Sequence, residues 1–126
     1  MGIIRTARNK KNIIVDNWHY IGGAGEPAFG AGWSNLAGYS VMGFKKLPFD
    51  NAIQIRANVV SNGASATICT LPVGYRPRAD VDLPVLFNAA GTYTARFITI
   101  STAGVVAVPV AGAATYIIFY SVFYTD

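Results

Sequence analysis

The clearest pattern of hydrophobic and polar positions is a clean alternation over residues 52–60, which read AIQIRANVV. Small or branched apolar residues take one face of this segment, and glutamine, arginine and asparagine take the other. Because a β-strand turns successive side chains to opposite faces of its sheet, the alternation predicts a strand with one face in a core and one face toward water. No segment shows the sustained apolar spacing of an amphipathic helix.

Other strand-like runs follow at short intervals, interrupted by glycine or proline. They read YSVMGFKKL (39–47), ATICT (66–70), VDLPVLFNA (81–89), TYTARFITIST (92–102), VVAVPV (105–110) and ATYIIFYSVFYT (114–125). Asn-Gly at 62–63 favours a tight turn and predicts a hairpin between strands 52–60 and 66–70. About eight evenly spaced strands predict an all-β fold, an antiparallel β-sandwich or jelly roll.

Turn residues refine this prediction. The Ala-Gly pairs at 90–91, 103–104 and 111–112 and the segment 48–51 predict the remaining turns. Prolines at 84 and 109 lack the N–H that a ladder needs, so their strands are expected to be locally edges or bulged. The segment LPVGYRP at 71–77 combines two prolines with a glycine and predicts a stiff, pre-shaped corner.

The last predicted strand is hydrophobic on both faces. Ile117, Phe119 and Phe123 alternate with Tyr120 and Val122. One face can pack on the core of a small sandwich, and the other needs a separate cover. The composition points the same way, since 52% of the residues are hydrophobic and only 13% are charged, about half the usual charged share. We therefore expect copies of the chain to bury this surface against one another.

The net charge of +4 comes from the N-terminus. Four of the ten basic residues, Arg5, Arg8, Lys10 and Lys11, precede every acidic residue, and the other six balance six acids. A basic segment can contact nucleic acid or an anionic surface, but a solvated terminal arm is the simpler interpretation, and nucleic acid is not expected as a partner. We expect a basic arm or stalk remnant at 1–15 and one sandwich domain at 16–126.

Cysteine usage and hydropathy limit the environment of the chain. Cys69 is the single cysteine, which excludes an intrachain disulfide and a cysteine-type zinc cluster, and its apolar neighbours predict a buried residue. No apolar run is long enough for a membrane span, and the first residues lack the core of a signal peptide. We expect a chain made in the cytoplasm that does not insert into a membrane.

Catalytic chemistry is poorly represented. His19 is the single histidine, and no Ser-His-Asp or Cys-His arrangement surrounds it. The glycine-rich segment 21–32 lacks the phosphate-loop pattern. Asp80 and Asp82 could form a carboxylate pair for glycoside hydrolysis, although solvated turn residues explain them more simply. The sequence thus predicts no enzyme, no cofactor and no metal site.

A binding surface remains as the favoured interpretation. Tryptophan and tyrosine suit saccharides, because a flat ring stacks on the apolar face of a sugar while polar neighbours bind its hydroxyls. Trp18 and Trp33 could provide such rings, and the alternative is that both fill the core or an interface.

Several features in chain order carry a resemblance to a known family. Trp18 lies near the first strand, and GWSNL at 32–36 places a second tryptophan before the next. AIQIRANVVSNG follows, a short strand then runs into the LPVGYRP corner, and ITISTAGVV turns through a glycine into another short strand. In this order, residues 16–126 resemble the receptor-binding head domains at the tips of tailed-bacteriophage tail fibres and baseplates. The corner is the most specific element.

The resemblance implies a β-sandwich homotrimer of the virion that binds host cell-surface saccharide near the clefts between protomers. It also implies an architectural corner with Tyr75 and Arg76 pinned, and a link to the rest of the tail or particle through the N-terminal end. The family fixes no saccharide site, so the candidates come from this chain: Arg76, Arg78, Asp80, Asp82, Trp33 and Arg96. The alternative is a structural or capsid-decoration virion protein of jelly-roll type.

Overall fold

The structure is a computed structural model that describes residues 15–48, 51–62, 65–109 and 113–125. These residues form strands, turns and irregular segments, and no helix capable of crossing a bilayer is found among them. The strands are β1 (His19–Tyr20), β2 (Trp33–Asn35), β3 (Gly43–Lys46), β4 (Ala52–Asn62), β5 (Thr67–Thr70), β6 (Val81–Ala89), β7 (Thr92–Ile100), β8 (Val105–Ala107) and β9 (Ala113–Tyr124).

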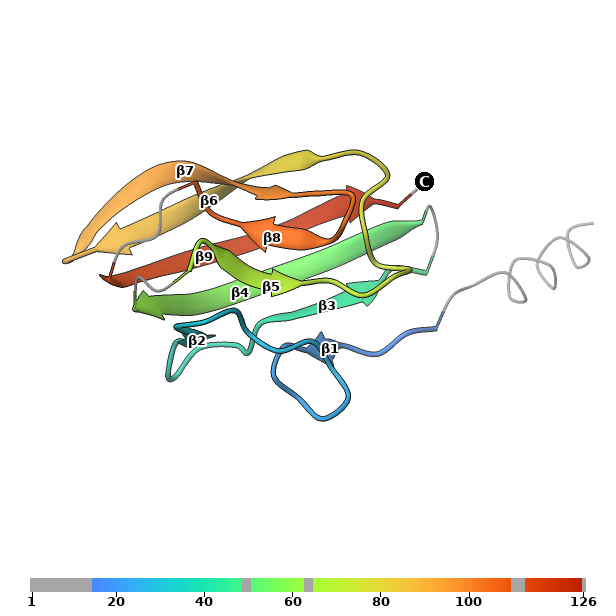
Figure 1. The fold of residues 1–126 in the computed structure, drawn as a ribbon, viewed down its shortest axis with the longest axis horizontal. Coiled ribbons are helices and arrows are strands. Elements are labelled where there is room, and N and C mark those ends of the chain that lie inside the picture. The colour runs from blue at the N-terminus through green and yellow to red at the C-terminus, as the bar shows by residue number, and fades with distance from the viewer. Residues whose placement is uncertain (1–14, 49–50, 63–64, 110–112, 126) are drawn as a thin grey trace, which may run out of the picture.

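All of these strands belong to one antiparallel sheet. Its order is β1-β3-β4-β9-β6-β7-β8-β5, with β2 paired to β4 beside β3. The sheet curls like half a barrel, so that β8 and β5 lie over one face of the long strands β4 and β9 (Figure 1). The all-β, antiparallel prediction is therefore confirmed.

The core fills the inside of the curl. The apolar face predicted for β4 is buried, with Ile55, Ala57 and Val59 fully excluded from solvent. These residues pair in register with inward-facing residues of β9, for example Ala57 with Phe119 and Val59 with Ile117. Apolar residues of β5, β7 and β8 close the core from the other side: Ile68, Cys69, Ile98, Ile100 and Val106.

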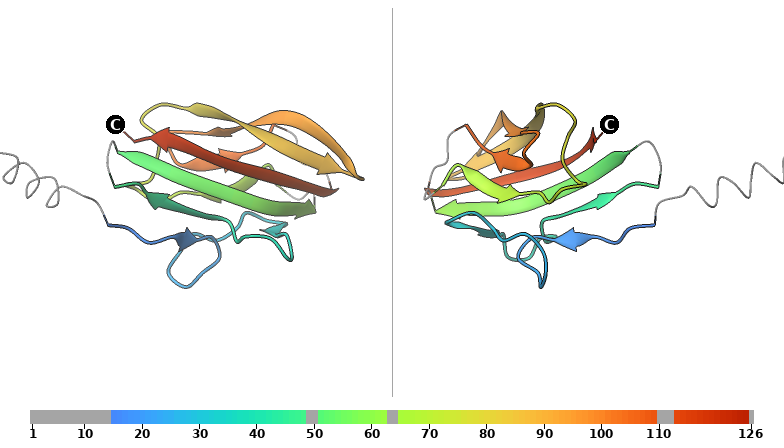
Figure 2. Two further views of the ribbon diagram at one scale, coloured as in Figure 1. Left: turned by 180° about the vertical axis from the view of Figure 1, so that it is seen from behind. Right: turned by 45° about the vertical axis from the view of Figure 1, so that its right-hand side comes forward.

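The opposite face of the sheet forms what we call the outer face, the side of β1, β3, β4, β6, β7 and β9 that points away from the core. No other element of the described chain covers it (Figure 2, left). The outer face is less polar than its sequence suggests. The polar side chain of Asn58 is buried, and its Nδ2 donates to the hydroxyl of the exposed Tyr120 at 3.4 Å. Its exposed large apolar side chains are Leu86, Tyr93, Phe97, Tyr120, Val122 and Tyr124.

The predicted hairpin between strands 52–60 and 66–70 is wrong. Strand β4 pairs with β9 on one edge and with β3 and β2 on the other, so neither edge is left for β5. Strand β5 instead pairs with β8, which comes only after the corner, β6 and β7 in the chain. Asn-Gly expresses a local turn preference, and in the structure β9 on one edge and β3 and β2 on the other take up both edges of β4 instead. Residues 63 and 64 lie outside the described part of the chain.

Two predicted turns and one proline are as expected. Ala90 and Gly91 both have positive φ between β6 and β7, and Gly104 has a φ of 84° where its N–H bonds to the carbonyl of Ser101. Pro84 lies where β6 is locally an edge, since the ladder to β9 covers Leu86–Asn88 and does not reach it. The turn predicted at 111–112 and residues 49 and 50 of the segment 48–51 lie outside the described residues.

The corner at 71–77 connects β5 to β6 and is pinned at both ends. The N–H of Leu71 donates to the carbonyl of Gly104, and the N–H of Tyr75 donates to that of Pro72. The guanidinium Nε of Arg76 donates to the carbonyl of Leu71 at 2.9 Å. A Cβ on Gly104 would come within 2.5 Å of that same carbonyl oxygen, so glycine is required for the close approach.

Candidate functional site

The short strand β1 presents side chains to both faces of the sheet. It pairs with β3 through His19 with Phe44 and Tyr20 with Gly43. His19 stacks on the buried Phe44, with ring centroids 5.2 Å apart. Tyr20 and Trp18 flank this position on the opposite face, where their rings lie against the bare Cα of Gly43. Two different sites therefore share this strand, one on each side of the sheet.

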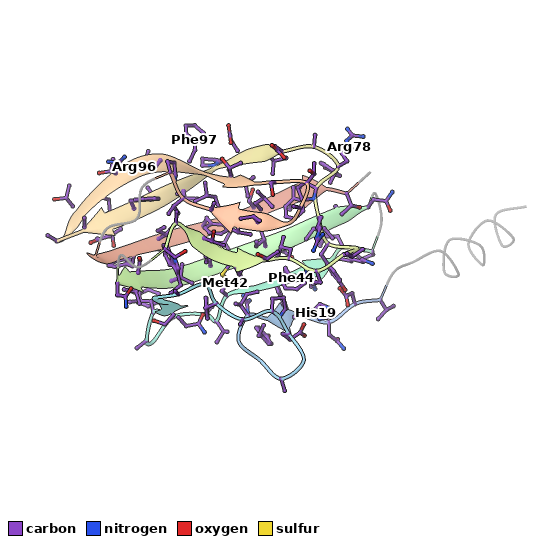
Figure 3. The ribbon with its side chains drawn as sticks, viewed as in Figure 1. His19, Met42, Phe44, Arg78, Arg96 and Phe97 are labelled. Atoms are coloured by element: carbon purple, nitrogen blue, oxygen red, sulfur yellow. The ribbon has the colours of Figure 1, made fainter. Side chains whose placement is uncertain are left out.

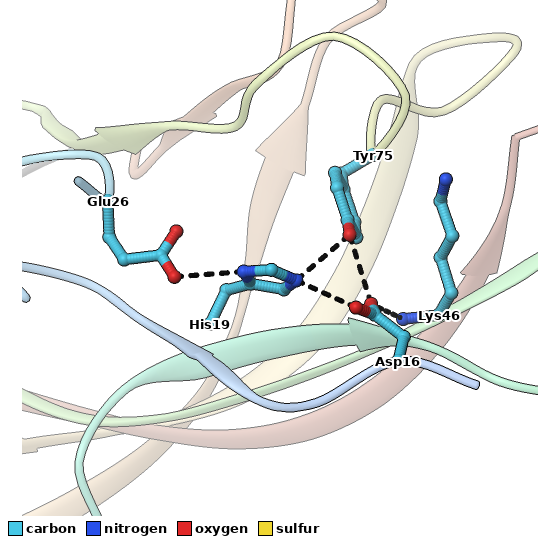
Figure 4. Close-up of polar contacts among 5 residues, drawn as sticks. All are labelled: Asp16, His19, Glu26, Lys46 and Tyr75. Atoms are coloured by element: carbon cyan, nitrogen blue, oxygen red, sulfur yellow. Dashed lines mark hydrogen bonds and ion pairs between the residues drawn. The ribbon is translucent and has the colours of Figure 1, made fainter.

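The site on the core side is a polar cluster built around His19 (Figure 4). Its Nδ1 lies 2.8 Å from Oε2 of Glu26, and its Nε2 lies 2.9 Å from Oδ1 of Asp16. The other oxygen of Asp16 accepts from the hydroxyl of Tyr75 at 3.0 Å and from the backbone N–H of Lys46 at 2.9 Å. We call Asp16, His19, Glu26 and Tyr75 the His19 cluster.

The geometry favours a doubly protonated imidazole, because each ring nitrogen of His19 faces a carboxylate oxygen. Burial lowers the pKa of His19, but the hydrogen bonds and charges of Asp16 and Glu26 outweigh it and raise the pKa above its ordinary value. For Asp16 the effects have the opposite signs. Burial raises the pKa of its carboxyl group, but the hydrogen bonds from Lys46, His19 and Tyr75 outweigh burial and lower the pKa below its ordinary value. Each partner thus stabilises the charged form of the other.

Tyr75 ties this cluster to the corner. Its ring packs edge-on against both His19 and Phe44, at centroid distances of 5.1 and 4.9 Å. The ammonium of Lys46 lies 4.8 Å from the same ring. Burial and the neighbouring carboxylate of Asp16 raise the pKa of Tyr75 to about 12, so the phenol stays protonated and donates. The pinned tyrosine expected from the family resemblance agrees with this contact.

The hydrogen bonds of the His19 cluster hold β1 in place. A two-residue ladder supplies few backbone hydrogen bonds, and the side-chain bonds join β1 to the loop after it and to the corner. Within the described residues, no group of three or more His, Cys, Asp or Glu side chains has an arrangement suited to a metal ion. These hydrogen bonds position β1 against the loop after it and against the corner.

The site on the outer face joins aromatic rings to cations. The guanidinium carbon of Arg56 lies 4.2 Å from the ring centroid of Trp18 and 5.8 Å from that of Tyr20. The ammonium of Lys45 lies 5.4 Å from the Trp18 ring. The register explains the arrangement, since Tyr20 pairs with Gly43 and Gly43 pairs with Arg56. We call Trp18, Tyr20, Lys45 and Arg56 the cationic cluster.

The residues predicted for saccharide binding are scattered. Trp33 is only 5% exposed, and its indole N–H donates to the carbonyl of Ser65, which agrees with its alternative interpretation as a core residue. Arg76 is committed to the corner through the carbonyl of Leu71. Arg96 lies over the ring of Phe87, 5.6 Å from its centroid.

The remaining candidates lie at the corner end of β6. Asp80 accepts from the backbone N–H of Thr102, and Asp82 accepts from the hydroxyl of Thr99. Arg78 is exposed, and its backbone N–H donates to the carbonyl of Tyr124. Arg78 precedes β6 at one end of the β6–β7 pair, whereas Arg96 lies midway along β7 opposite Val85, and Figure 3 shows the two side chains well apart. The six candidates therefore do not form one constellation.

Sequence reasoning missed the contacts that build both clusters. The alternation of 52–60 placed Arg56 on the outward face, which was the one available signal for the cationic cluster. Asp16, Glu26 and Lys45 carried no pattern of their own, because their partners come from distant strands. Comparison of the chain with protein-family models, with curated proteins and with solved structures found no match.

Proposed function

We propose that this chain is the receptor-binding head of a tailed-bacteriophage virion, a jelly-roll sandwich that assembles as a homotrimer and attaches the particle to saccharide on the host cell surface. It binds without catalysis, and its N-terminal end leads to the rest of the tail. The order of strand, glycine and corner motifs supports the family, and the pinned Tyr75 and Arg76 fit the corner that the family implies.

The observation that carries the proposal is the apolar character of the outer face. Tyr120 and Phe97 are each 59% exposed and Leu86 is 47% exposed, all on strands that lie side by side. An open apolar hollow of about 390 Å³ lies between β6 and β9, lined by Pro84, Leu86, Ile118 and Tyr120 among others. Contiguous apolar surface of this kind marks an interaction site on a soluble domain.

Burial against a second copy of the chain would remove the exposed apolar side chains of the outer face from water. The chemistry of the outer face changes at the paired residues Arg56 and Tyr120. Cations and aromatic rings lie on the β1–β3 side of this pair, and mainly apolar side chains lie on the β6–β7 side. Burying the apolar side in a cyclic trimer would leave the cationic side at the rim. Three weak sites per trimer, and many trimers per virion, would then raise avidity without further contacts.

Light scattering on the purified chain tests the assembly. At micromolar concentration we expect three times the chain mass, and Tyr120→Ser combined with Phe97→Ser should reduce it to one. Val73→Ser serves as the matched control, because Val73 is also highly exposed but lies on the corner. A wild-type chain that stays monomeric would contradict the proposal.

A screen against host cell-wall saccharides tests attachment. We expect reversible binding without release of reducing ends. Ala variants of Arg76, Arg78, Asp80, Asp82 and Arg96 report whether the predicted positions contribute. Absence of saccharide binding by a correctly assembled trimer would reject the attachment role.

The basic run at the N-terminus favours one other candidate, a structural or capsid-decoration virion protein of jelly-roll type whose basic arm reaches the particle. These residues lie outside the described part of the chain. Deleting residues 1–12 separates the two functions: a decoration protein should lose particle binding, and an attachment head should still bind cells.

A further inference from the structure

The cationic cluster has an uncompensated positive charge. Among the described residues, the ion pairs join His19 to Asp16 and Glu26 on the core side of β1, and none reaches Lys45 or Arg56. The two other described acids, Asp80 and Asp82, bind Thr102 and Thr99 beside the corner and on β7. Two cations therefore stand together on the outer face with no carboxylate neighbour in the described chain.

The cations are held in position by rings. Arg56 lies over Trp18, and its Nε donates to the carbonyl of Val41 at 3.3 Å, which fixes the plane of the guanidinium. Lys45 lies above the same ring from the neighbouring strand. Within the described residues, the terminal nitrogens of Arg56 and the ammonium of Lys45 have no hydrogen-bond acceptor. An oriented guanidinium with unused N–H groups suits a planar or tetrahedral oxyanion.

An exposed ring lies beside these donors. Tyr20 is 41% exposed on the outer face, one strand away from Arg56 across Gly43. A phenol ring accepts the apolar face of a sugar and offers its hydroxyl for a hydrogen bond. Gly43 keeps the intervening position free of a side chain, so the ring and the guanidinium approach each other.

We propose that the cationic cluster is the subsite for an anionic saccharide, with Lys45 and Arg56 binding a sugar-borne carboxylate or phosphate and Tyr20 stacking on the ring that carries it. This inference rests on the proposed attachment function and names its ligand class. Trp18 is a positioning residue, because it orients both cations and need not touch the ligand.

The test measures binding of the full chain to three probes by calorimetry: a galacturonate oligosaccharide, its neutral methyl ester, and a phosphorylated oligosaccharide. We expect the galacturonate to bind about tenfold more tightly than the ester, because the ester loses charge-assisted hydrogen bonds. Affinity should fall with added salt. The phosphorylated probe shows which anion the site prefers.

Variants locate the effect on the structure. Lys45→Gln and Arg56→Gln should each weaken galacturonate binding by about tenfold and leave the ester unaffected. Lys46→Gln is the matched control, because it removes the same charge from the next residue of β3 on the opposite face, where Lys46 lies over Tyr75. Arg56→Lys keeps the charge and should lose less. Circular dichroism confirms that each variant folds, and Lys45→Gln carries the test should Arg56→Gln unfold.

Two results would overturn the inference: equal binding of galacturonate and its ester, or equal losses from Lys45→Gln and Lys46→Gln. Binding of a neutral host saccharide by a trimer that ignores both anionic probes would reject the anionic subsite and leave the attachment function standing. A monomer that binds no saccharide would reject both.

Discussion

The hydroxyl oxygen of Tyr75 lies 2.9 Å from Nε2 of His19, and this contact joins the corner after β5 to the first strand across 56 residues of chain. The same hydroxyl donates to Asp16, while Nδ1 of His19 reaches Glu26. One phenol thus links the corner to β1, the strand that carries Tyr20 and directly follows Trp18. We therefore expect the orientation of the outer cationic cluster to depend on the His19 cluster on the other side of the sheet.

Replacing Tyr75 with phenylalanine should weaken the His19 cluster and lower the free energy of unfolding. The variant keeps the ring that packs on Phe44 but leaves Asp16 without one donor, which costs about 1 to 3 kcal/mol for a partly buried charged acceptor. Urea unfolding measures the loss. Tyr124→Phe is the control, because it removes the same atom from an exposed site and should change stability by less than about 0.5 kcal/mol. Equal losses of unfolding free energy in the two variants would contradict a stabilising role for the His19 cluster.

Stability should depend on pH through both His19 and Asp16. The pKa of His19 is raised, so its contribution is complete below the ordinary value of 6.5 and is lost as the pH rises through the raised pKa. The pKa of Asp16 is lowered, so its contribution is complete above 3.8 and is lost as the pH falls through the lowered pKa.

Urea midpoints across the pH range measure this dependence. His19→Gln should remove the decline that sets in above pH 6.5, since His19 is the single histidine of the chain, and Asp16→Asn should reduce the decline that sets in below pH 3.8. A decline above pH 6.5 that persists unchanged in His19→Gln would rule out this assignment.

Alanine at Gly104 should be far more costly than alanine at Gly38. Both glycines have a positive φ, 84° and 83°, so each substitution carries the same left-handed strain of about 1 to 2 kcal/mol. At Gly38 the new methyl group meets open space, whereas at Gly104 it meets the carbonyl of Leu71 and the side chain of Arg76. The difference between the two unfolding free energies isolates the clash that fixes the corner. Equal losses would show that the corner can relax.

Trp33→Phe should reduce stability without changing saccharide affinity. The indole N–H donates to the carbonyl of Ser65 at 2.9 Å, and its loss leaves that acceptor unpaired at a cost of about 1 to 3 kcal/mol. Because the ring is buried, no ligand can stack on it. A variant with normal stability and lost saccharide binding would place Trp33 in a binding site after all.

Strand positions were largely predictable from the sequence. The alternation of Ile53, Ile55, Ala57 and Val59 located β4 and its buried face, and the two-sided pattern of β9 identified an apolar surface beyond the core. These features are readable because the side chains of a strand repeat every two residues whatever its neighbours are.

The candidate site was much less predictable. Arg76 and Trp33 looked like ligand contacts because of their residue types. Trp33 is buried, and both side chains donate hydrogen bonds to backbone carbonyls that commit them to the fold. Asp16, Glu26 and Lys45 looked unremarkable, yet they complete the two clusters around β1.

Local patterns along the chain indicate where the strands lie, which way their side chains point and where the chain turns. The pairing of β4 with β9 rather than β5, and the contacts of His19 with Tyr75 and of Trp18 with Arg56, emerge only in the folded protein. This is because the direction of side chains and the position of turns are local properties of the backbone. Pairing instead joins segments that lie far apart in the chain. The favoured pairing is the one that buries the most apolar surface while the enclosed polar groups keep their hydrogen bonds.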